Sequence, residues 1–158
     1  MNLTDILYHD MINAMKTHDD LKLSVIRMAR TSITNKEKAL RGVRFIEDSD
    51  VLTILINMVK QRQDSVEQFT KGNRLELAEK EKAEIEILES YLPKLMPRGD
   101  VITLVENVLD KTPNDNWKIG SIIKLCNEEA AKFNCRVDGK LLSELVNSAI
   151  RARNGVVR

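Results

Sequence analysis

The sequence predicts an all-α protein, with an N-terminal domain like a four-helix bundle followed by a smaller domain of three helices. Apolar residues recur at three- and four-residue spacing through nearly all of the 158 residues, without the alternation typical of strands. Aromatic residues make up only 4% of the chain, whereas the helix-favouring residues Leu, Ala, Glu and Lys are abundant. One segment rich in proline and glycine, residues 93–100, separates the two helical regions.

Four helices are predicted before this break. Thr4 is expected to cap the first, and the second covers residues 20–41, with Gly42 suited to the left-handed position that follows a helix. The acidic segment 47–50 opens the third helix, because carboxylates favour the positive end of the helix dipole. A short turn after about residue 70 leads to the fourth, which ends before Pro93. The N-terminal domain is therefore predicted to span residues 1–92.

The segment PKLMPRGD, residues 93–100, is predicted to be a linker because its prolines and glycine oppose regular structure. Residues 101–158 then form the small C-terminal helical domain, with helices over about 101–110, 118–133 and 139–152. Asp100 and Asp138 are expected to cap the first and the last of these helices. The basic tail, residues 151–158, is expected to be frayed.

The composition limits the classes of function. With a net charge of +1, the chain has no overall field that attracts nucleic acid, so an RNA site would have to be a local patch. Two cysteines, Cys126 and Cys135, form neither a zinc motif nor a disulfide framework, which predicts a reducing compartment. The N-terminus resembles neither a signal peptide nor a typical transit peptide, and no apolar run reaches the ~20 residues of a membrane span. We therefore expect a soluble, cytoplasmic protein.

An arginine stands in the middle of the apolar face of the predicted third helix. The neighbours of Arg62 on that face are all apolar: Val51, Leu55, Met58, Val59, Val66 and Phe69. Because a short turn should make the third and fourth helices antiparallel, pairing Phe69 with Leu77 sets Arg62 opposite Glu84, with Glu81 as a second acceptor. We interpret these three charges as a structural ion pair that fixes the register. The alternative is that Arg62 reaches a ligand through a gap in the bundle.

No catalytic motif is visible in the sequence. It lacks the glycine-rich phosphate loops, the nucleophile elbow of serine hydrolases and the spacing of metal ligands. His9 is interpreted as a surface or boundary histidine. We therefore predict no catalytic, cofactor-binding or metal-binding residue, and we do not expect the chain alone to be an enzyme.

A basic stripe along the predicted second helix is the main candidate binding site. Arg27, Arg30, Lys38 and Arg41 recur at a spacing that places them opposite the core. Such a line of donors could follow a phosphate backbone, whereas the alternative is an ordinary solvated helix face. The other RNA-binding candidates are cations on the third helix and in the second domain: Lys60, Lys71, Lys118, Lys124, Arg136 and Lys140.

Four segments resemble the GatB/YqeY family: RMARTSITNKE (27–37), KQRQDSVEQFTKGNRLELAEKEKAEIEILESYLP (60–93), KIGSIIK (118–124) and VDGKLLSELV (137–146). The second is the longest and most specific. The chain resembles a free-standing YqeY-like protein, similar to the C-terminal tail of the B subunit of aspartyl/glutamyl-tRNA amidotransferase.

This resemblance implies a two-part helical fold and a non-catalytic accessory function in binding tRNA. The implied partners are tRNA and an amidotransferase or aminoacyl-tRNA synthetase, without a membrane or a metal. The alternative is a protein–protein adaptor or accessory subunit in tRNA-dependent transamidation, a carbon–nitrogen ligase activity with glutamine as amido donor. That activity is associated with the family, but the catalytic parts of the amidotransferase lie outside the module.

Overall fold

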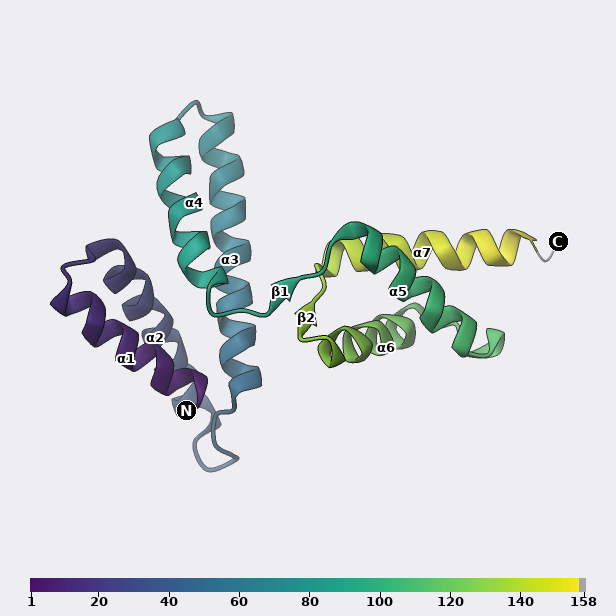
Figure 1. Cartoon of the computed structure of the whole chain (residues 1–158), viewed down its shortest axis with the longest axis horizontal. Coiled ribbons are helices and arrows are strands. Elements are labelled where there is room, and N and C mark those ends of the chain that lie inside the picture. The colour runs from purple at the N-terminus through teal and green to yellow at the C-terminus, as the bar shows by residue number, and fades with distance from the viewer. Residues whose placement is uncertain (157–158) are drawn as a thin grey trace. The chain divides into compact units, whose positions relative to one another are not determined.

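Two helical hairpins make up the first half of the protein (Figure 1). The structure is a computed structural model that describes residues 1–156, and its contacts divide the chain into two units, Met1–Leu92 and the residues from Pro93 onward. In the first unit, α1 (Leu3–Lys16) is followed by α2 (Asp20–Leu40), and α3 (Asp48–Lys71) is followed by α4 (Leu75–Glu89). α2 contacts α1, α3 and α4 and thereby joins the two hairpins.

Side-chain caps fix where α1 and α2 begin. The predicted cap Thr4 is wrong, because Asn2 accepts a hydrogen bond from the backbone N–H of Asp5 at 2.8 Å and Thr4 lies inside the first turn. Asp19 caps α2 in the same way, through the N–H of Lys22 at 3.1 Å. α2 ends at Leu40, and Gly42 has a φ of 84°, the left-handed conformation expected after a helix.

The core of the first unit is formed by the inward faces of all four helices. Its buried members are Leu7, Val25, Ile26, Ala29, Ile33, Val51, Leu55, Met58, Val59, Leu88 and Leu92. These residues recur every three or four positions along their helices, so the periodicity of the sequence marks the face that each helix buries. α4 ends at Glu89, earlier than predicted, and the chain turns before Pro93.

Three helices form the second unit around a separate core. They are α5 (Arg98–Lys111), α6 (Ile119–Lys132) and α7 (Gly139–Val156), with a short 3-10 helix at Asn114–Asn116. The largest buried side chains of this core are Val101, Val105, Leu109, Ile122, Leu142 and Val146. The described residues thus form seven α-helices, and the predicted all-α class is confirmed.

The second unit also contains a small parallel sheet that the sequence did not predict. β1 (Lys94–Leu95) pairs with β2 (Cys135–Arg136), and the N–H of Met96 donates to the carbonyl of Arg136 at 2.8 Å. Strands of two residues are too short to produce an alternating pattern. Part of the predicted linker 93–100 is therefore ordered by pairing with a distant segment.

The ends of α5 and α7 differ from the prediction. α5 already begins at Arg98, so Asp100 lies in its first turn and is not its cap. Asp138 does cap α7, since its carboxylate accepts from the N–H of Leu141 at 3.0 Å. The expected fraying of the tail is wrong for residues 151–156, because Arg153 in α7 pairs with Asp110 in α5 at 2.8 Å. Residues 157–158 lie outside the described part of the chain.

Candidate functional site

The structure brings Arg62 and Glu84 together inside the first unit. Only 8% of the Arg62 surface and 7% of the Glu84 surface are exposed, and Arg62 Nε lies 2.8 Å from Glu84 Oε2. The predicted antiparallel register of α3 and α4 therefore places the two charges on the same level. A buried guanidinium with a buried carboxylate partner has a structural role, because neither group is accessible to a ligand.

Glu81 does not join this pair. The remaining nitrogens of Arg62 contact the carbonyl of Met58 at 3.2 Å and the sulfur of Met28 at 3.6 Å. Arg62 therefore bonds one turn back along its own helix and reaches across to α2. Its guanidinium fork is satisfied by groups already in the core, so the predicted second carboxylate is not needed.

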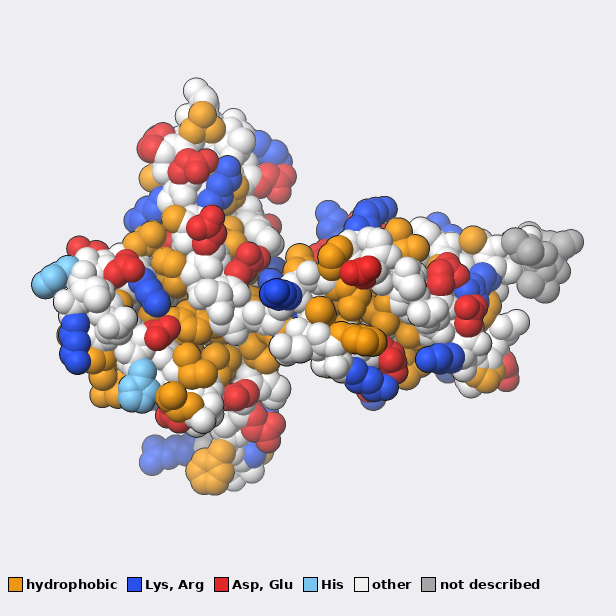
Figure 2. Space-filling view, viewed as in Figure 1, with side chains coloured by type: hydrophobic (Ala, Val, Ile, Leu, Met, Phe, Trp, Pro, Cys, Tyr) orange, Lys and Arg blue, Asp and Glu red, His pale blue; other side chains and the backbone are white. Residues whose placement is uncertain are grey.

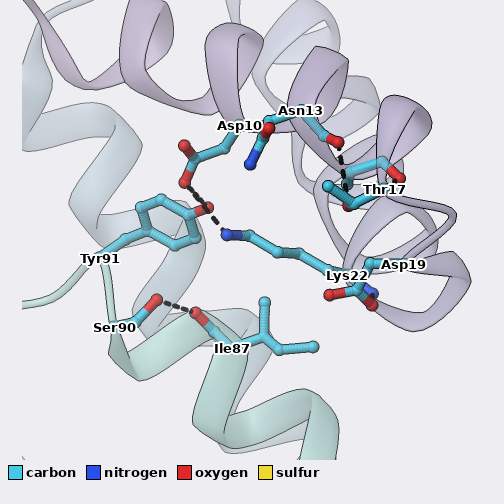
Figure 3. Close-up of polar contacts among 9 residues, drawn as sticks. Asp10, Asn13, Thr17, Asp19, Lys22, Ile87, Ser90 and Tyr91 are labelled. Carbon is cyan, nitrogen blue, oxygen red and sulfur yellow. Dashed lines mark hydrogen bonds and ion pairs between the residues drawn. The ribbon is translucent and has the colours of Figure 1, made fainter.

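A second polar cluster ties the end of α4 to the first hairpin (Figure 3). The hydroxyl of Tyr91 donates a hydrogen bond to the Asp10 carboxylate on α1, and Lys22 Nζ on α2 lies 3.5 Å from the same carboxylate. Burial and this hydrogen bond raise the pKa of Tyr91 above its usual range. Tyr91 is therefore a protonated donor at neutral pH and holds α1, α2 and α4 in register.

The predicted basic stripe on α2 divides into two parts. Arg27, Arg30 and Lys38 line a surface hollow of about 540 Å³ together with Met11, Thr31, Thr34 and Asn35. Arg41 instead lines a neighbouring hollow of about 480 Å³, formed by the turn between α2 and α3. The first hollow combines cations with neutral polar or apolar groups, a lining that suits an anion, whereas Glu37 also lines the second.

Arg30 is less available for binding a partner than the sequence indicates. Its guanidinium lies over the ring of Tyr8, 5.0 Å from the ring centre, and one of its nitrogens is 3.2 Å from the sulfur of Met11. Both partners belong to α1, so Arg30 also supports the packing of the first hairpin. Arg27, Lys38 and Arg41 are exposed.

The other predicted cations are dispersed. Lys60 and Lys71 are exposed on α3, and Lys71 pairs with Glu67 at 2.7 Å. In the second unit, Arg136 donates to the Pro93 carbonyl at 3.2 Å and so helps to hold the small sheet. Lys118, Lys124 and Lys140 are exposed at the start of α6, on α6 and at the start of α7.

Sequence reasoning located the turn between α2 and α3 but missed its exposed apolar tip. Val43 is 79% exposed and Phe45 is 93% exposed, although both are apolar. Figure 2 shows hydrophobic and basic side chains gathered where Figure 1 places this turn, at the lower end of the first unit. The motif RGVRFIEDSD contains the signal, since apolar residues stand between a helix-ending glycine and the acidic start of the next helix, outside the period of either helix.

An apolar groove in the second unit was also not predicted. It lies between α5 and α6, has a volume of about 370 Å³ and contains Leu104, Val108, Leu125 and Phe133. Phe133 forms an exposed part of the wall because α6 ends just before it. Lys111 and Glu129 lie in the same lining and give the groove a charged border.

Neither the cysteines nor the acidic residues form a reactive centre in the described part of the chain. Burial raises the pKa of the Cys126 thiol to about 11, so this cysteine is not a nucleophile at neutral pH. Residues 1–156 contain no group of three or more His, Cys, Asp or Glu side chains placed to hold a metal ion. None of the helices described has the length and apolar character needed to span a bilayer.

Comparison with known proteins decides the family. The family described as Yqey-like protein matches residues 4–150. The chain belongs to this family. The resemblance to the GatB/YqeY family that its motifs indicated is thereby confirmed, and the Yqey-like module covers both units.

Several relatives are named altered inheritance of mitochondria protein 41, mitochondrial. That of Lachancea thermotolerans is 30% identical over 140 residues, which cover 86% of this chain and 74% of the relative. That of Candida glabrata is 34% identical over 94 residues, covering 60% of this chain and 52% of the relative. This Yqey-like chain therefore matches only about half of some relatives.

These relatives correct two predictions. The tRNA-binding accessory module, and its alternative of an adaptor or subunit in transamidation, is contradicted, because the relatives are named for mitochondrial inheritance and not as tRNA amidotransferase subunits. The shared motif encodes the helical module, and one module serves different functions in different proteins. The cytoplasmic assignment is contradicted by the mitochondrial relatives. It rested on a reducing compartment, on a missing membrane span and on an N-terminus that resembles neither a signal peptide nor a typical transit peptide. The first two do not separate the cytoplasm from the mitochondrial interior.

Proposed function

We propose that this Yqey-like protein acts in mitochondria as a binding protein that supports their inheritance, and that the basic surface of α2 holds an acidic partner. The names of the relatives support the mitochondrial setting. The distribution of charge supports the binding surface. The fold supports binding more than catalysis, since its buried polar groups are used for packing.

One observation carries the proposal. Residues 27–45 contain six cationic side chains and a single acid, Glu37, which leaves a net charge of +5, whereas the whole chain has a net charge of +1. The rest of the protein is therefore net negative, and the cations concentrate on α2 and the turn after it. A local excess of this kind attracts an acidic partner and orients the protein toward it.

The geometry of α2 allows these cations to act together. Its apolar face is fixed in the core by Val25, Ile26, Ala29 and Ile33, so the opposite face is held rigidly toward solvent. Arg27 and Lys38 lie three turns apart along this face, and Thr31 and Thr34 add hydroxyl groups between them. Because the helix already fixes the spacing of these residues, the backbone loses little conformational entropy when they bind an anionic surface.

A binding assay tests the charge dependence directly. The variant with Arg27→Gln, Lys38→Gln and Arg41→Gln should elute from immobilised heparin, a generic polyanion, at lower salt than the unchanged protein. Arg30 is retained because it packs on Tyr8. The control is Lys60→Gln with Lys71→Gln, which removes two exposed cations from α3 and should have a smaller effect per charge removed. Equal elution of the folded triple variant and the unchanged protein would refute the proposal.

A complementation assay tests the biological role. A Saccharomyces cerevisiae relative of the same name is 30% identical over 103 residues, covering 65% of this chain and 55% of the relative. Yeast cells lacking it should recover normal inheritance of mitochondria when this chain is directed into their mitochondria. The triple variant should not restore inheritance, whereas the α3 control should. Full rescue by the triple variant would contradict a role for the α2 surface.

A further inference from the structure

We propose that the acidic partner of the α2 surface is an anionic lipid bilayer, and that Val43 and Phe45 enter its interfacial region. This inference rests on the proposed function and names the partner of the same surface. Five features of the turn between α2 and α3 support it: its bracing, its apolar tip, its flanking cations, the position of the nearby acids and the kind of side chain exposed.

The turn is braced from within. The backbone N–H groups of Val43 and Arg44 both donate to the carbonyl of Leu40, at 2.9 and 3.2 Å. The Arg44 guanidinium makes two hydrogen bonds to the Asp50 carboxylate, at 2.7 and 2.8 Å, and a third to the Phe45 carbonyl at 3.0 Å. The exposed tip is therefore ordered in the free protein, so a partner does not have to order it on binding.

The apolar side chains of the turn are divided between core and solvent. Ile46 packs against the core of the first unit, whereas Val43 is 79% exposed and Phe45 is 93% exposed. Two neighbouring apolar side chains held in water at the tip of a turn are unfavourable unless a partner removes them from water. A bilayer interface does this without needing a complementary pocket.

Cations flank the tip on the side of α2. Lys36, Lys38 and Arg41 are exposed within the last turn and a half of the helix and the residue after it. Each basic side chain near an anionic bilayer strengthens binding, roughly fivefold per residue. Paired apolar and basic elements of this kind supply the two contributions that stable membrane association requires.

Three acids follow the turn, and one of them is paired with an arginine. Asp50 is bound by Arg44, which holds the pKa of that carboxyl well below its usual range. Asp48 accepts from the N–H of Leu3 at 3.0 Å, and Glu47 forms a capping box with Asp50 at the start of α3. Hydrogen bonds from backbone N–H groups leave Glu47 and Asp48 charged. The attraction to an anionic surface therefore comes from the side of α2, where the cations outnumber a single acid, Glu37.

The exposed side chains favour lipid over nucleic acid. Single-stranded RNA stacks its bases on aromatic rings, so Phe45 alone would suit RNA, but an exposed valine offers no stacking surface. Val43 and Phe45 together suit hydrocarbon, which accepts aliphatic and aromatic side chains alike. Binding of RNA is therefore the competing outcome of the test.

Vesicle co-sedimentation of the intact protein provides that test. We expect binding to vesicles of phosphatidylcholine and phosphatidylglycerol, weakening with salt, and little binding to phosphatidylcholine alone. The variant with Val43→Ser and Phe45→Ser should bind the anionic vesicles at least about tenfold more weakly, because two apolar side chains no longer leave water. Its elution from heparin should not change. The matched control is Phe133→Ser, which removes an exposed aromatic side chain from the second unit and should bind like the unchanged protein.

Fluorescence gives an independent measure of insertion. The protein has a single tryptophan, Trp117, so the spectrum of a Phe45→Trp variant minus that of the unchanged protein reports residue 45 alone. Its emission should shift to the blue on anionic vesicles and not on heparin or a single-stranded RNA.

The outcomes separate the two proposals. Unchanged vesicle binding by the serine variant, or no blue shift, would overturn membrane docking. Retention on heparin or RNA without vesicle binding would overturn it too, while leaving an acidic partner in place. The proposed function itself would be refuted if the triple charge variant and the unchanged protein eluted from heparin at the same salt concentration.

Discussion

Replacing Arg62 with methionine should strongly destabilise the first unit. The substitution keeps an unbranched side chain in the core but removes the charge that neutralises Glu84. Both side chains are nearly inaccessible, so water cannot solvate the carboxylate that remains. Breaking a buried ion pair from one side destabilises by about 3–5 kcal/mol, and we expect a loss of free energy of unfolding in this range.

The loss of stability should appear when one charge of the pair is removed, but not when both are removed. Arg62 donates to Glu84 at 2.8 Å, and its other contacts are a carbonyl and a sulfur atom in the core. Arg62→Met combined with Glu84→Leu removes both charges together. Replacing a buried ion pair by apolar side chains is often neutral or stabilising, so the double variant should be close to the unchanged protein.

Urea unfolding measures this double-mutant cycle. Circular dichroism follows the helices of both units, whereas fluorescence of Trp117 reports the second unit, where its indole N–H donates to the Thr112 carbonyl at 3.0 Å. Where the units unfold separately, the single variant should lower the midpoint seen by circular dichroism and leave the fluorescence transition unchanged. The cycle should give a coupling energy of several kcal/mol between positions 62 and 84.

A matched control is Gln61→Met, which alters the neighbouring exposed position of α3. It should change stability by less than about 0.5 kcal/mol. An Arg62→Met variant whose free energy of unfolding lies within about 1 kcal/mol of the unchanged protein would refute the structural role of the pair. A double variant no more stable than the single one would refute it too.

Three further predictions follow from local features. Limited trypsin digestion should cut first after Arg41 or Arg44, in the exposed turn, and a first cut between the two units would contradict this. At neutral to slightly alkaline pH, a thiol reagent should modify Cys135 in the native protein and Cys126 only after denaturation, because burial raises the pKa of Cys126 to about 11; equal rates would contradict the buried thiol. Asp50→Asn should lower the thermal midpoint near neutral pH, and because the Asp50 pKa is lowered by Arg44, the difference from the unchanged protein should shrink as pH falls below about 4. A difference that grows with acidity would refute this assignment.

The sequence was sufficient to predict the pair between Arg62 and Glu84. Two features made this possible: charges of opposite sign on the facing apolar sides of the two helices, and a turn short enough to fix the antiparallel register. The same periodicity located the buried faces of the helices in both units. Helix ends were less predictable because several residues competed for the same cap, as Asn2 and Thr4 did at α1.

Other features depend on contacts between residues far apart in the sequence. β1 forms only because β2 lies beside it, some 40 residues later, and neither segment has a strand pattern of its own. Arg30 seemed to belong to a solvated stripe until the structure placed Tyr8 beneath it. The exposed tip at Val43 and Phe45 likewise requires knowledge of which apolar residues the core leaves out.

The most specific family motif describes a scaffold more than a site. Within residues 60–93, Arg62, Glu84 and Leu88 are buried, and Tyr91 anchors α4 to Asp10. A chain that must form this hairpin needs these residues whatever it binds, so the motif identifies the family without naming a partner. Specific function must therefore reside on surfaces that the fold does not use for packing. The basic surface of α2 and the apolar turn after it meet this condition, because their exposed side chains contribute little to the core. Val43 and Phe45 are in addition unfavourable in water without a partner.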